Sequence, residues 1–257
     1  MTNKGTVKTE IHFPEITDKK FIDECVNLHN KHRSSVNPQA SNMRHMTWDE
    51  ALAVTARAWA RKCVFEHNIY LGETKRVHPI YTSVGENIWA GAPPAHFSVE
   101  TAINSWMKEV KYYTYDSHSC TRVCGHYTQV VWADSYKVGC AVQVCPDGVS
   151  KTTFSSKKGV IFVCDYATGG NYNGVKPYKT GKSCSACMDD TCQDKLCYNP
   201  ERDRLKRYNW RPDWDPDLAS CDSFCKAVLA IRPITLALTF ISVYCLQIHY
   251  PDLFAYE

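Results

Sequence analysis

The first twenty residues lack the apolar core that a secretory signal peptide requires. The chain also has no Asn-x-Ser/Thr sequon, so N-glycosylation gives no guide to its compartment. Neither sign of charge dominates, because 30 basic and 27 acidic residues leave a net charge of +3, which does not indicate nucleic-acid binding. The basic run at 202–211 is interpreted as the solvated face of a linker. The motif G-x-S-x-G is absent as well, which argues against a serine hydrolase.

Cysteine, in contrast, is abundant. Fourteen cysteines among 257 residues are an even number and far more than a cytosolic protein of this size usually carries. They predict a disulfide framework and an extracellular or cell-surface location. Since no signal peptide is visible, we rank three explanations: an alternative start, another export route, and reduced cysteines, in that order.

The C-terminal region is mostly apolar from 227 to 248, close to a membrane-spanning length, with Arg232 and Pro233 interrupting it. Small residues lie just upstream, as they do before a lipid-anchor attachment site: Ala219, Ser220 and Ser223. The polar ending HYPDLFAYE fits that signal poorly. We expect this tail to anchor the chain in a membrane, as a spanning helix or as the signal for a GPI anchor.

Three helices are predicted in the first half of the chain. Asp18 is expected to cap a helix that runs through Arg33. Thr47 and Glu50 form a capping-box pattern, which predicts that a second helix opens there. Ser98 is expected to begin a third helix with an apolar stripe at helical spacing.

Strands are predicted at 126–132, 137–145 and 160–166, where apolar residues alternate or form short runs. Helices first and strands afterwards indicate a sheet sandwiched by helices, in the α+β class. After Tyr166 the sequence becomes rich in Gly, Asn and Lys and loses its periodicity, which predicts a domain boundary.

The segment GHYTQVVW contains the first candidate for chemistry, His126, and three other residues could join it: His78, Glu86 and Glu109. Glu109 lies seven positions after the core-facing Ala102, which is about 700° along a helix, so it projects close to the apolar stripe. A glutamate there caps a buried network, lines a cleft or lies on the surface, and the helix pattern does not separate these readings.

Four segments carry a family resemblance: LHNKHR at 28–33, GENIW at 85–89, GHYTQVVW at 125–132 and CDYATGGNY at 164–172. Together they resemble the CAP superfamily of cysteine-rich secretory, antigen 5 and pathogenesis-related proteins, and most of all the glioma pathogenesis-related proteins and their paralogues. The resemblance covers about residues 20–175 and implies a three-layer α-β-α sandwich. Asp165 departs from the family pattern, in which a small polar or basic residue usually follows the cysteine.

The resemblance also divides the chain. We expect an N-terminal tail at 1–17, a CAP domain at 18–175, a cysteine-rich hinge at 176–200, a linker at 201–226 and a hydrophobic tail at 227–257. It implies five disulfides: Cys63–Cys145, Cys140–Cys164, Cys120–Cys124, Cys184–Cys192 and Cys187–Cys197. Four cysteines stay unassigned: Cys25, Cys221, Cys225 and Cys245.

The family further implies a cleft tetrad of two histidines and two glutamates. His78 and His126 are the expected metal ligands, and Glu86 and Glu109 are the expected cleft carboxylates that orient them. Neutral imidazoles suit Zn²⁺, so zinc is the expected cofactor. The four residues lie 8, 23 and 17 positions apart, a spacing that is not diagnostic of a metal site.

We therefore expect a non-enzymatic binding module whose partners are an extracellular or cell-surface protein, or a sterol or other lipid. The resemblance implies gamete interaction (sperm–egg binding) or immune defence. One alternative is a zinc-dependent hydrolase that uses the tetrad. Two others are a Cys₄ zinc module at 184–197 in a reducing compartment, and a degenerate copy whose tetrad is structural.

Overall fold

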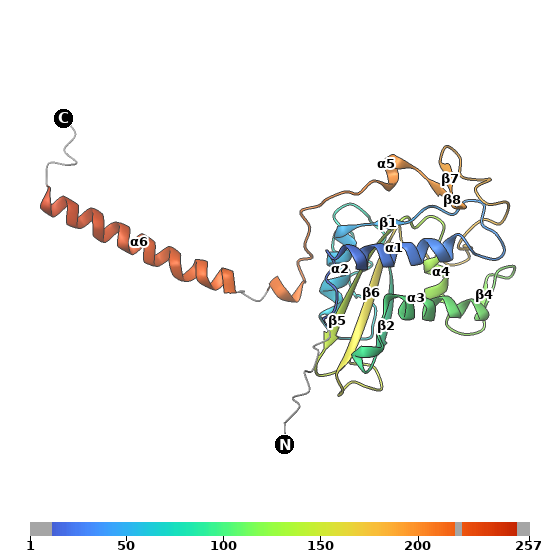
Figure 1. The fold of residues 1–257 in the computed structure, drawn as a ribbon, viewed down its shortest axis with the longest axis horizontal. Coiled ribbons are helices and arrows are strands. Elements are labelled where there is room, and N and C mark those ends of the chain that lie inside the picture. The colour runs from blue at the N-terminus through green and yellow to red at the C-terminus, as the bar shows by residue number, and fades with distance from the viewer. Residues whose placement is uncertain (1–11, 219–222, 251–257) are drawn as a thin grey trace, which may run out of the picture. The chain divides into compact units, whose positions relative to one another are not determined.

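The computed structural model describes residues 12–218 and 223–250, which fall into two compact units that divide after Asp215. The first unit contains a four-stranded sheet with its helices, and the second contains the short η3 (Pro216–Leu218) and the long helix α6 (Ser223–His249) (Figure 1). This mixture of helices and sheet is the predicted α+β class.

The sheet has the strand order β1-β5-β6-β2. β5 (Lys137–Cys145) pairs antiparallel with β6 (Gly159–Ala167), β2 (Gly85–Gly91) adds antiparallel to β6, and the short β1 (Thr47–Trp48) adds parallel to β5. The strands predicted at 137–145 and 160–166 are confirmed, and β6 extends slightly beyond its prediction. Every residue of β6 is buried, because this central strand is covered on both faces.

Two of the predicted helices begin where their caps indicate. α1 (Lys19–Arg33) follows Asp18, whose side chain accepts a hydrogen bond from the backbone N–H of Lys20. α3 (Val99–Met107) follows Ser98, whose hydroxyl accepts one from the N–H of Thr101. Each cap satisfies a backbone donor that has no partner inside the helix.

The second helix, α2 (Glu50–Ala60), has a different cap from the one predicted. Asp49 is the N-cap residue, and its carboxylate accepts a hydrogen bond from the backbone N–H of Leu52 at 3.1 Å. Thr47 instead belongs to β1, where its N–H donates to the carbonyl of Tyr136. The capping-box prediction was wrong because strand pairing uses the backbone of Thr47.

The strand predicted at 126–132 is also wrong, because Gly125–Val130 forms the short helix α4. The carboxylate of Glu109, in the 3-10 turn η2 (Lys108–Tyr112), accepts hydrogen bonds from the backbone N–H groups of His126 and Tyr127. Those two donors would otherwise be unpaired at the helix start. Most of this short helix is buried all round, so its sequence shows no helical period.

Helices cover both faces of the sheet. On one face, Phe162 of β6 contacts the rings of Phe21 in α1 and Trp106 in α3. On the other face, α2 lies so close to Gly139 of β5 that a Cβ atom there would be 2.1 Å from the backbone nitrogen of Ala53. Since side chains alternate along a strand, α2 lies on one side and α1 and α3 on the other. This is the expected three-layer α-β-α sandwich (Figure 1).

The cysteine-rich hinge belongs to the same compact unit. From Thr191 onward it contains β7 (Thr191–Gln193) and β8 (Leu196–Tyr198), and α5 (Pro200–Asp203) follows them. The loops of the preceding domain contain three further short elements: η1 (Pro94–His96), β3 (Tyr113–Thr114) and β4 (Ser119–Cys120). Cys197 of β8 donates its N–H to the carbonyl of Met43 and accepts from the N–H of His45. The predicted hinge therefore lies against the domain that precedes it.

The first part of the predicted linker is also held. Residues 208–215, the strap, lie against α2 and the loop after it. Trp214 stacks on Tyr70 with ring centroids 5.0 Å apart and donates its indole N–H to the carbonyl of Arg76. Trp210 donates its indole N–H to the hydroxyl of Thr55. The strap fixes the chain to the domain as far as Asp215.

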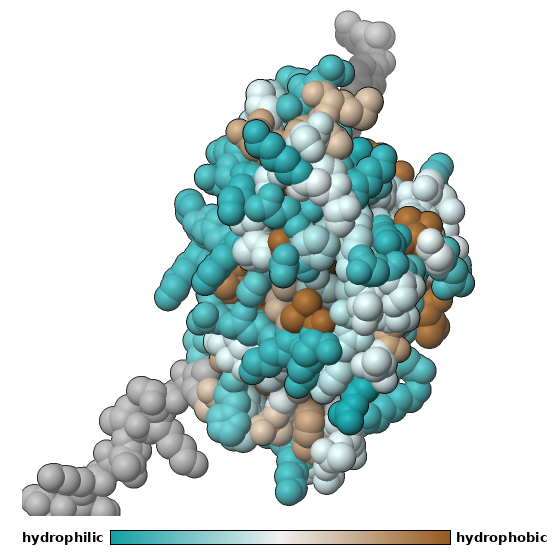
Figure 2. Space-filling model, turned by 90° about the vertical axis from the view of Figure 1, so that its right-hand side faces the viewer, coloured by the Kyte–Doolittle hydropathy of each residue, from teal (hydrophilic) through white to brown (hydrophobic). Residues whose placement is uncertain are grey.

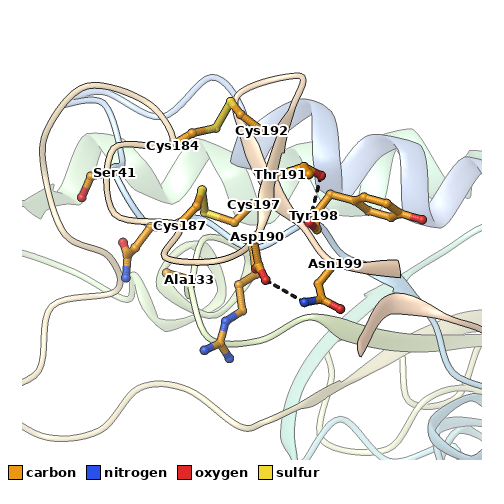
Figure 3. The surroundings of a disulfide bond; sticks show 12 residues. Ser41, Ala133, Cys184, Cys187, Asp190, Thr191, Cys192, Cys197, Tyr198 and Asn199 are labelled. Atoms are coloured by element: carbon orange, nitrogen blue, oxygen red, sulfur yellow. Dashed lines mark hydrogen bonds between the residues drawn. A yellow bond between two sulfur atoms is a disulfide. The ribbon is translucent and has the colours of Figure 1, made fainter. Parts of the chain in front are cut away.

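All five expected disulfides are present: Cys63–Cys145, Cys120–Cys124, Cys140–Cys164, Cys184–Cys192 and Cys187–Cys197. Figure 3 shows the last two beside each other in the hinge, so the four hinge cysteines do not form the alternative Cys₄ zinc module. Cys225 is disulfide-bonded as well, and Cys221 lies outside the described residues. Among the described cysteines, Cys25 is a buried free thiol and Cys245 an exposed one.

Helix α6 contains the apolar region of the tail. Its segment Cys225–His249 is 25 residues long and contains an 18-residue stretch with a mean hydropathy of 1.8, so it is long and apolar enough to cross a membrane. Pro233 lies inside the helix. The last residues of the predicted tail, 251–257, lie outside the described residues.

Candidate functional site

The imidazole of His126 is held by Glu109. Nδ1 of His126 lies 2.7 Å from Oε1 of Glu109, while Oε2 of the same carboxylate accepts the N–H groups of His126 and Tyr127 at 3.1 and 3.2 Å. A carboxylate accepts, so Nδ1 donates and the ring is oriented with Nε2 directed away from the pair. The side chains of His126 and Glu109 are 23% and 16% exposed, so this pair borders solvent.

Glu86 makes a second histidine–carboxylate pair, but its partner is His67. Oε1 of Glu86 accepts from Nδ1 of His67 at 2.8 Å and from the backbone N–H of Asn68 at 2.9 Å. The hydrogen bond that His67 donates to Glu86 raises the pKa of His67, and burial raises the pKa of the Glu86 carboxyl. Sequence reasoning missed His67, which lies 19 positions before Glu86 in a loop with no periodic pattern.

The expectation that His78 is a metal ligand beside Glu86 is corrected by its surroundings. The ring is fully buried, and Nε2 lies 3.2 Å from the carboxylate of Asp49. Nδ1 accepts hydrogen bonds from the backbone N–H groups of Ile80 and Tyr81, both at 3.0 Å. Both ring nitrogens are therefore engaged, and His78 joins the α2 cap to the loop that follows.

The two glutamates thus each pair with a histidine, Glu86 with His67 and Glu109 with His126, and β2 connects the two pairs. Asn87, the residue after Glu86, donates its side-chain N–H to the carbonyl of His126 at 3.0 Å. Consecutive residues of a strand face opposite sides of the sheet, so Glu86 and His67 lie on the α2 side, whereas Asn87 and His126 lie on the α4 side. β2 is an edge strand of the sheet, so both pairs lie at this edge.

Each pair alone offers fewer ligands than a protein-held zinc site usually has. Zinc sites take three or four ligands from the protein. Within residues 12–218 and 223–250, no group of three or more His, Cys, Asp or Glu side chains is placed to hold a metal ion. We assign no chemistry to a metal at these pairs.

Asp165 adds a buried acid beside Glu86. The two residues are register partners on β6 and β2, so their side chains lie on the same face at neighbouring positions. Oε2 of Glu86 and both carboxyl oxygens of Asp165 are buried without a hydrogen-bond partner. Burial and then the charge of Glu86 raise the pKa of Asp165 well above its ordinary value. Three buried acceptors without a donor favour the protonated form of these carboxyls.

An apolar groove lies between the start of α1 and the start of α3, and residues 12–14 also line it. Its volume is about 300 Å³, at the lower end of the sizes typical for ligand pockets. The walls are mainly aromatic and aliphatic, with charges at the rim: Phe13, Pro14, Phe21, Phe97 and Val99, with Asp18, Lys20 and Glu24. By contrast, the face shown in Figure 2 is mostly hydrophilic, with hydrophobic residues in small separate patches.

Comparison with known proteins agrees with this fold. Residues 26–166 match the family model of the cysteine-rich secretory protein family, CAP. The chain is 48% identical over 210 residues to GLIPR1-like protein 1 of Bos taurus, covering 81% of this chain and 84% of that protein. It is 45% identical over 243 residues to glioma pathogenesis-related protein 1 of Mus musculus, covering 93% and 89%.

Among solved structures, the chain resembles NaASP2 with Zn²⁺ at 25% identity and a TM-score of 0.55, covering 70% of this chain and 96% of that one. It also resembles Na-ASP-1 at 25% identity and a TM-score of 0.56, covering 74% and 52%. The family model covers more than half of the chain, and the curated relatives align over most of their length. The chain belongs to the CAP family of cysteine-rich secretory proteins.

Proposed function

We propose that this chain is a non-enzymatic binding protein of the cell surface or extracellular space. The hydrogen bonds that the two glutamates accept are the main support for this proposal. Glu86 and Glu109 each accept hydrogen bonds from a histidine and from backbone N–H groups. A general base needs a lone pair directed at substrate or water, whereas Oε1 of Glu86 and both oxygens of Glu109 hold loops and a helix start in place, and Oε2 of Glu86 is buried. The arrangement supports binding over the alternative of zinc-dependent hydrolysis.

The groove between α1 and α3 supports a lipid ligand. Phe13 and Phe97 lie with ring centroids 6.0 Å apart, and Phe97 continues the apolar wall to Phe162 in the core. Such a wall favours a hydrocarbon chain. The charged lining residues have both signs, Lys20 with Asp18 and Glu24, so the apolar wall and not the rim charge supports this ligand. We propose a fatty acid or a similar single-chain lipid as the ligand of this groove.

A photo-crosslinkable palmitate tests this ligand directly. The full chain in nanodiscs is labelled, digested and mapped by mass spectrometry. We expect labelled peptides from 12–24 and 97–99, and weaker labelling when Phe13→Ala opens the wall. Phe65→Ala is the matched control, because Phe65 is 40% exposed and does not line the groove. Labelling confined to α6, or equal labelling of Phe13→Ala, contradicts the proposal.

The partly exposed histidine pairs are proposed as a contact surface for an extracellular or cell-surface protein. The oxidised hinge and the apolar helix α6 support display at a membrane, where the CAP unit faces the oxidising side. A role in gamete interaction or immune defence stays a proposal from family membership. Antibody staining of intact and permeabilised cells tests the topology, and a spanning helix or a GPI anchor are distinguished by phospholipase release.

Zinc binding stays a prediction for this chain. A solved relative is described with Zn²⁺, whereas the described donors here form pairs and not a three-ligand cluster. A ligand that binds the folded state raises the melting temperature. Zinc titration with an EDTA control measures this, and an unchanged melting temperature at saturating metal counts against the prediction.

A further inference from the structure

The tetrapeptide Arg204-Leu205-Lys206-Arg207 has basic side chains at three of its four positions. It lies after the last hinge disulfide, which ends at Cys197, and before the strap. Arg204 has extended backbone angles, φ −54° and ψ 147°, and residues 205–212 lie outside helices and strands. The basic run first interpreted as a solvated linker face is therefore an irregular segment between two anchored parts.

The side chains of this segment are accessible. Arg204 is 62% exposed and pairs with the exposed Glu201 at 3.3 Å, a contact that stabilises little in water. Leu205 is 62% exposed, Arg207 is exposed and Lys206 is half-buried. A binding partner can therefore take the two arginines without breaking a buried ion pair.

Endoproteases bind their substrates as extended strands, and successive side chains enter separate pockets. Basic residues at the first, second and fourth positions before the cut bond suit pockets lined by carboxylates, which bind guanidinium groups in a bidentate geometry. This is the specificity of subtilisin-like proprotein convertases. Those enzymes act in the oxidising secretory pathway, where a chain with five disulfides folds.

We propose that Arg204–Arg207 is a processing site at which such a convertase hydrolyses the Arg207–Tyr208 peptide bond. Water is the second reactant. The C–N bond breaks, Arg207 gains the carboxylate and Tyr208 gains the amine. This inference is independent of the proposed ligand, and it adds regulated separation of the CAP domain and hinge from α6.

The contacts around the site define what cleavage does. Each of the five disulfides assigned in the described residues joins two cysteines that precede Arg207. After the cut, the strap is held by the contacts of Trp214 with Tyr70 and Arg76 and by that of Trp210 with Thr55. The product is a nicked protein whose two parts separate when the strap leaves the domain.

The segment is fixed at both ends, so the convertase must bind a locally opened form. Nζ of Lys137 donates to the carbonyl of Arg204 at 2.9 Å, and the ring of Tyr208 lies 5.1 Å from that of His78. Only the three residues 205–207 lie between Arg204 and Tyr208, too few to fill an extended cleft without moving Tyr208. Loosening the strap should therefore speed the cut.

The test uses the full disulfide-bonded chain in nanodiscs, a purified subtilisin-like convertase and intact-mass analysis with and without reductant. We expect one new carboxyl end at Arg207 and one new amino end at Tyr208. Arg204→Ala and Arg207→Lys should each slow the cut by at least about tenfold, because a pocket built for a guanidinium loses its partner. Lys182→Ala, an exposed hinge variant, should cut like the wild type. Trp214→Ala should cut faster.

Arg207→Lys also separates enzyme classes, since trypsin-like proteases accept lysine at this position. A synthetic peptide of residues 201–211 shows that the convertase is active. The proposal is overturned if the peptide is cut but the folded chain stays intact, if Arg207→Lys is cut as fast as the wild type, or if the new ends lie elsewhere.

Discussion

Glu109 and His126 are joined twice: Nδ1 of the imidazole lies 2.7 Å from Oε1, and the backbone N–H of the same histidine donates to Oε2 at 3.1 Å. One carboxylate thus orients the ring and caps the helix that contains it. The pair explains why the segment GHYTQVVW begins a helix at this point, and it makes Glu109 a structural residue of the site.

Glu109→Gln should therefore destabilise the domain. The variant keeps one acceptor oxygen but loses the charge, so at least one of three donors loses its acceptor, at a cost of about 1–3 kcal/mol. The urea midpoint of unfolding measures this. Glu15→Gln, on an exposed residue outside the site, is the control and should leave the midpoint unchanged. Equal midpoints for all three proteins would mean that the cap contributes nothing.

The carboxyls of Glu86 and Asp165 predict a pH-dependent stability. The folded-state pKa of Asp165 is raised by burial and by Glu86, so the folded chain keeps a proton that the unfolded chain loses above about pH 4. Stability therefore falls as pH rises from about 4 toward the folded pKa, by up to about 1.4 kcal/mol per pH unit.

Asp165→Asn should remove this slope, because an amide does not titrate. We expect the stability of the variant relative to the wild type to grow between pH 4 and 8, measured by urea midpoints. Asp147→Asn, on an exposed turn, serves as the control. Parallel curves for Asp165→Asn and wild type would refute the raised pKa of Asp165.

His67 should titrate above the ordinary histidine pKa of about 6.5, because Glu86 accepts from its Nδ1. Its contribution to stability is fully present below the unfolded pKa and is lost as pH rises through the folded pKa. NMR titration of the imidazole measures the value, and Glu86→Gln should lower it. A wild-type pKa at or below that of the variant would contradict the pairing.

The disulfide framework predicts the number of reactive thiols. Among the described cysteines, Cys25 and Cys245 are free, whereas the five bridges and the bonded Cys225 occupy the others. Alkylation of the denatured, unreduced chain should modify Cys25 and Cys245 and leave the four hinge cysteines unmodified. Labelling of those four would restore the zinc-module interpretation.

Sequence patterns predicted the elements whose cause is local. Asp18 and Ser98 cap the helices that follow them, and the run at 160–166 becomes a central strand because all of its residues except Asp165 suit burial on the two faces of a sheet. The helix at His126 could not be found in this way, since its cap comes from Glu109, seventeen positions earlier.

The candidate site was predicted only in part, because its contacts also join residues that are far apart in the sequence. Glu109 and His126 do meet, as the family pattern implies. His78 is closer to Glu86 in sequence than His67 is. In the fold, however, His78 contacts Asp49, the N-cap residue of α2, and His67 contacts Glu86. Proximity along the chain is a poor guide where two loops compete for one carboxylate.

The most direct test of the account compares binding and hydrolysis in one preparation of wild type and of the double variant Glu86→Gln, Glu109→Gln. We predict that both folded proteins crosslink palmitate at residues 12–24 and 97–99. Neither should hydrolyse peptide or ester substrates, with or without zinc. Hydrolysis by the wild type that disappears in the double variant would contradict a binding function and establish an enzyme.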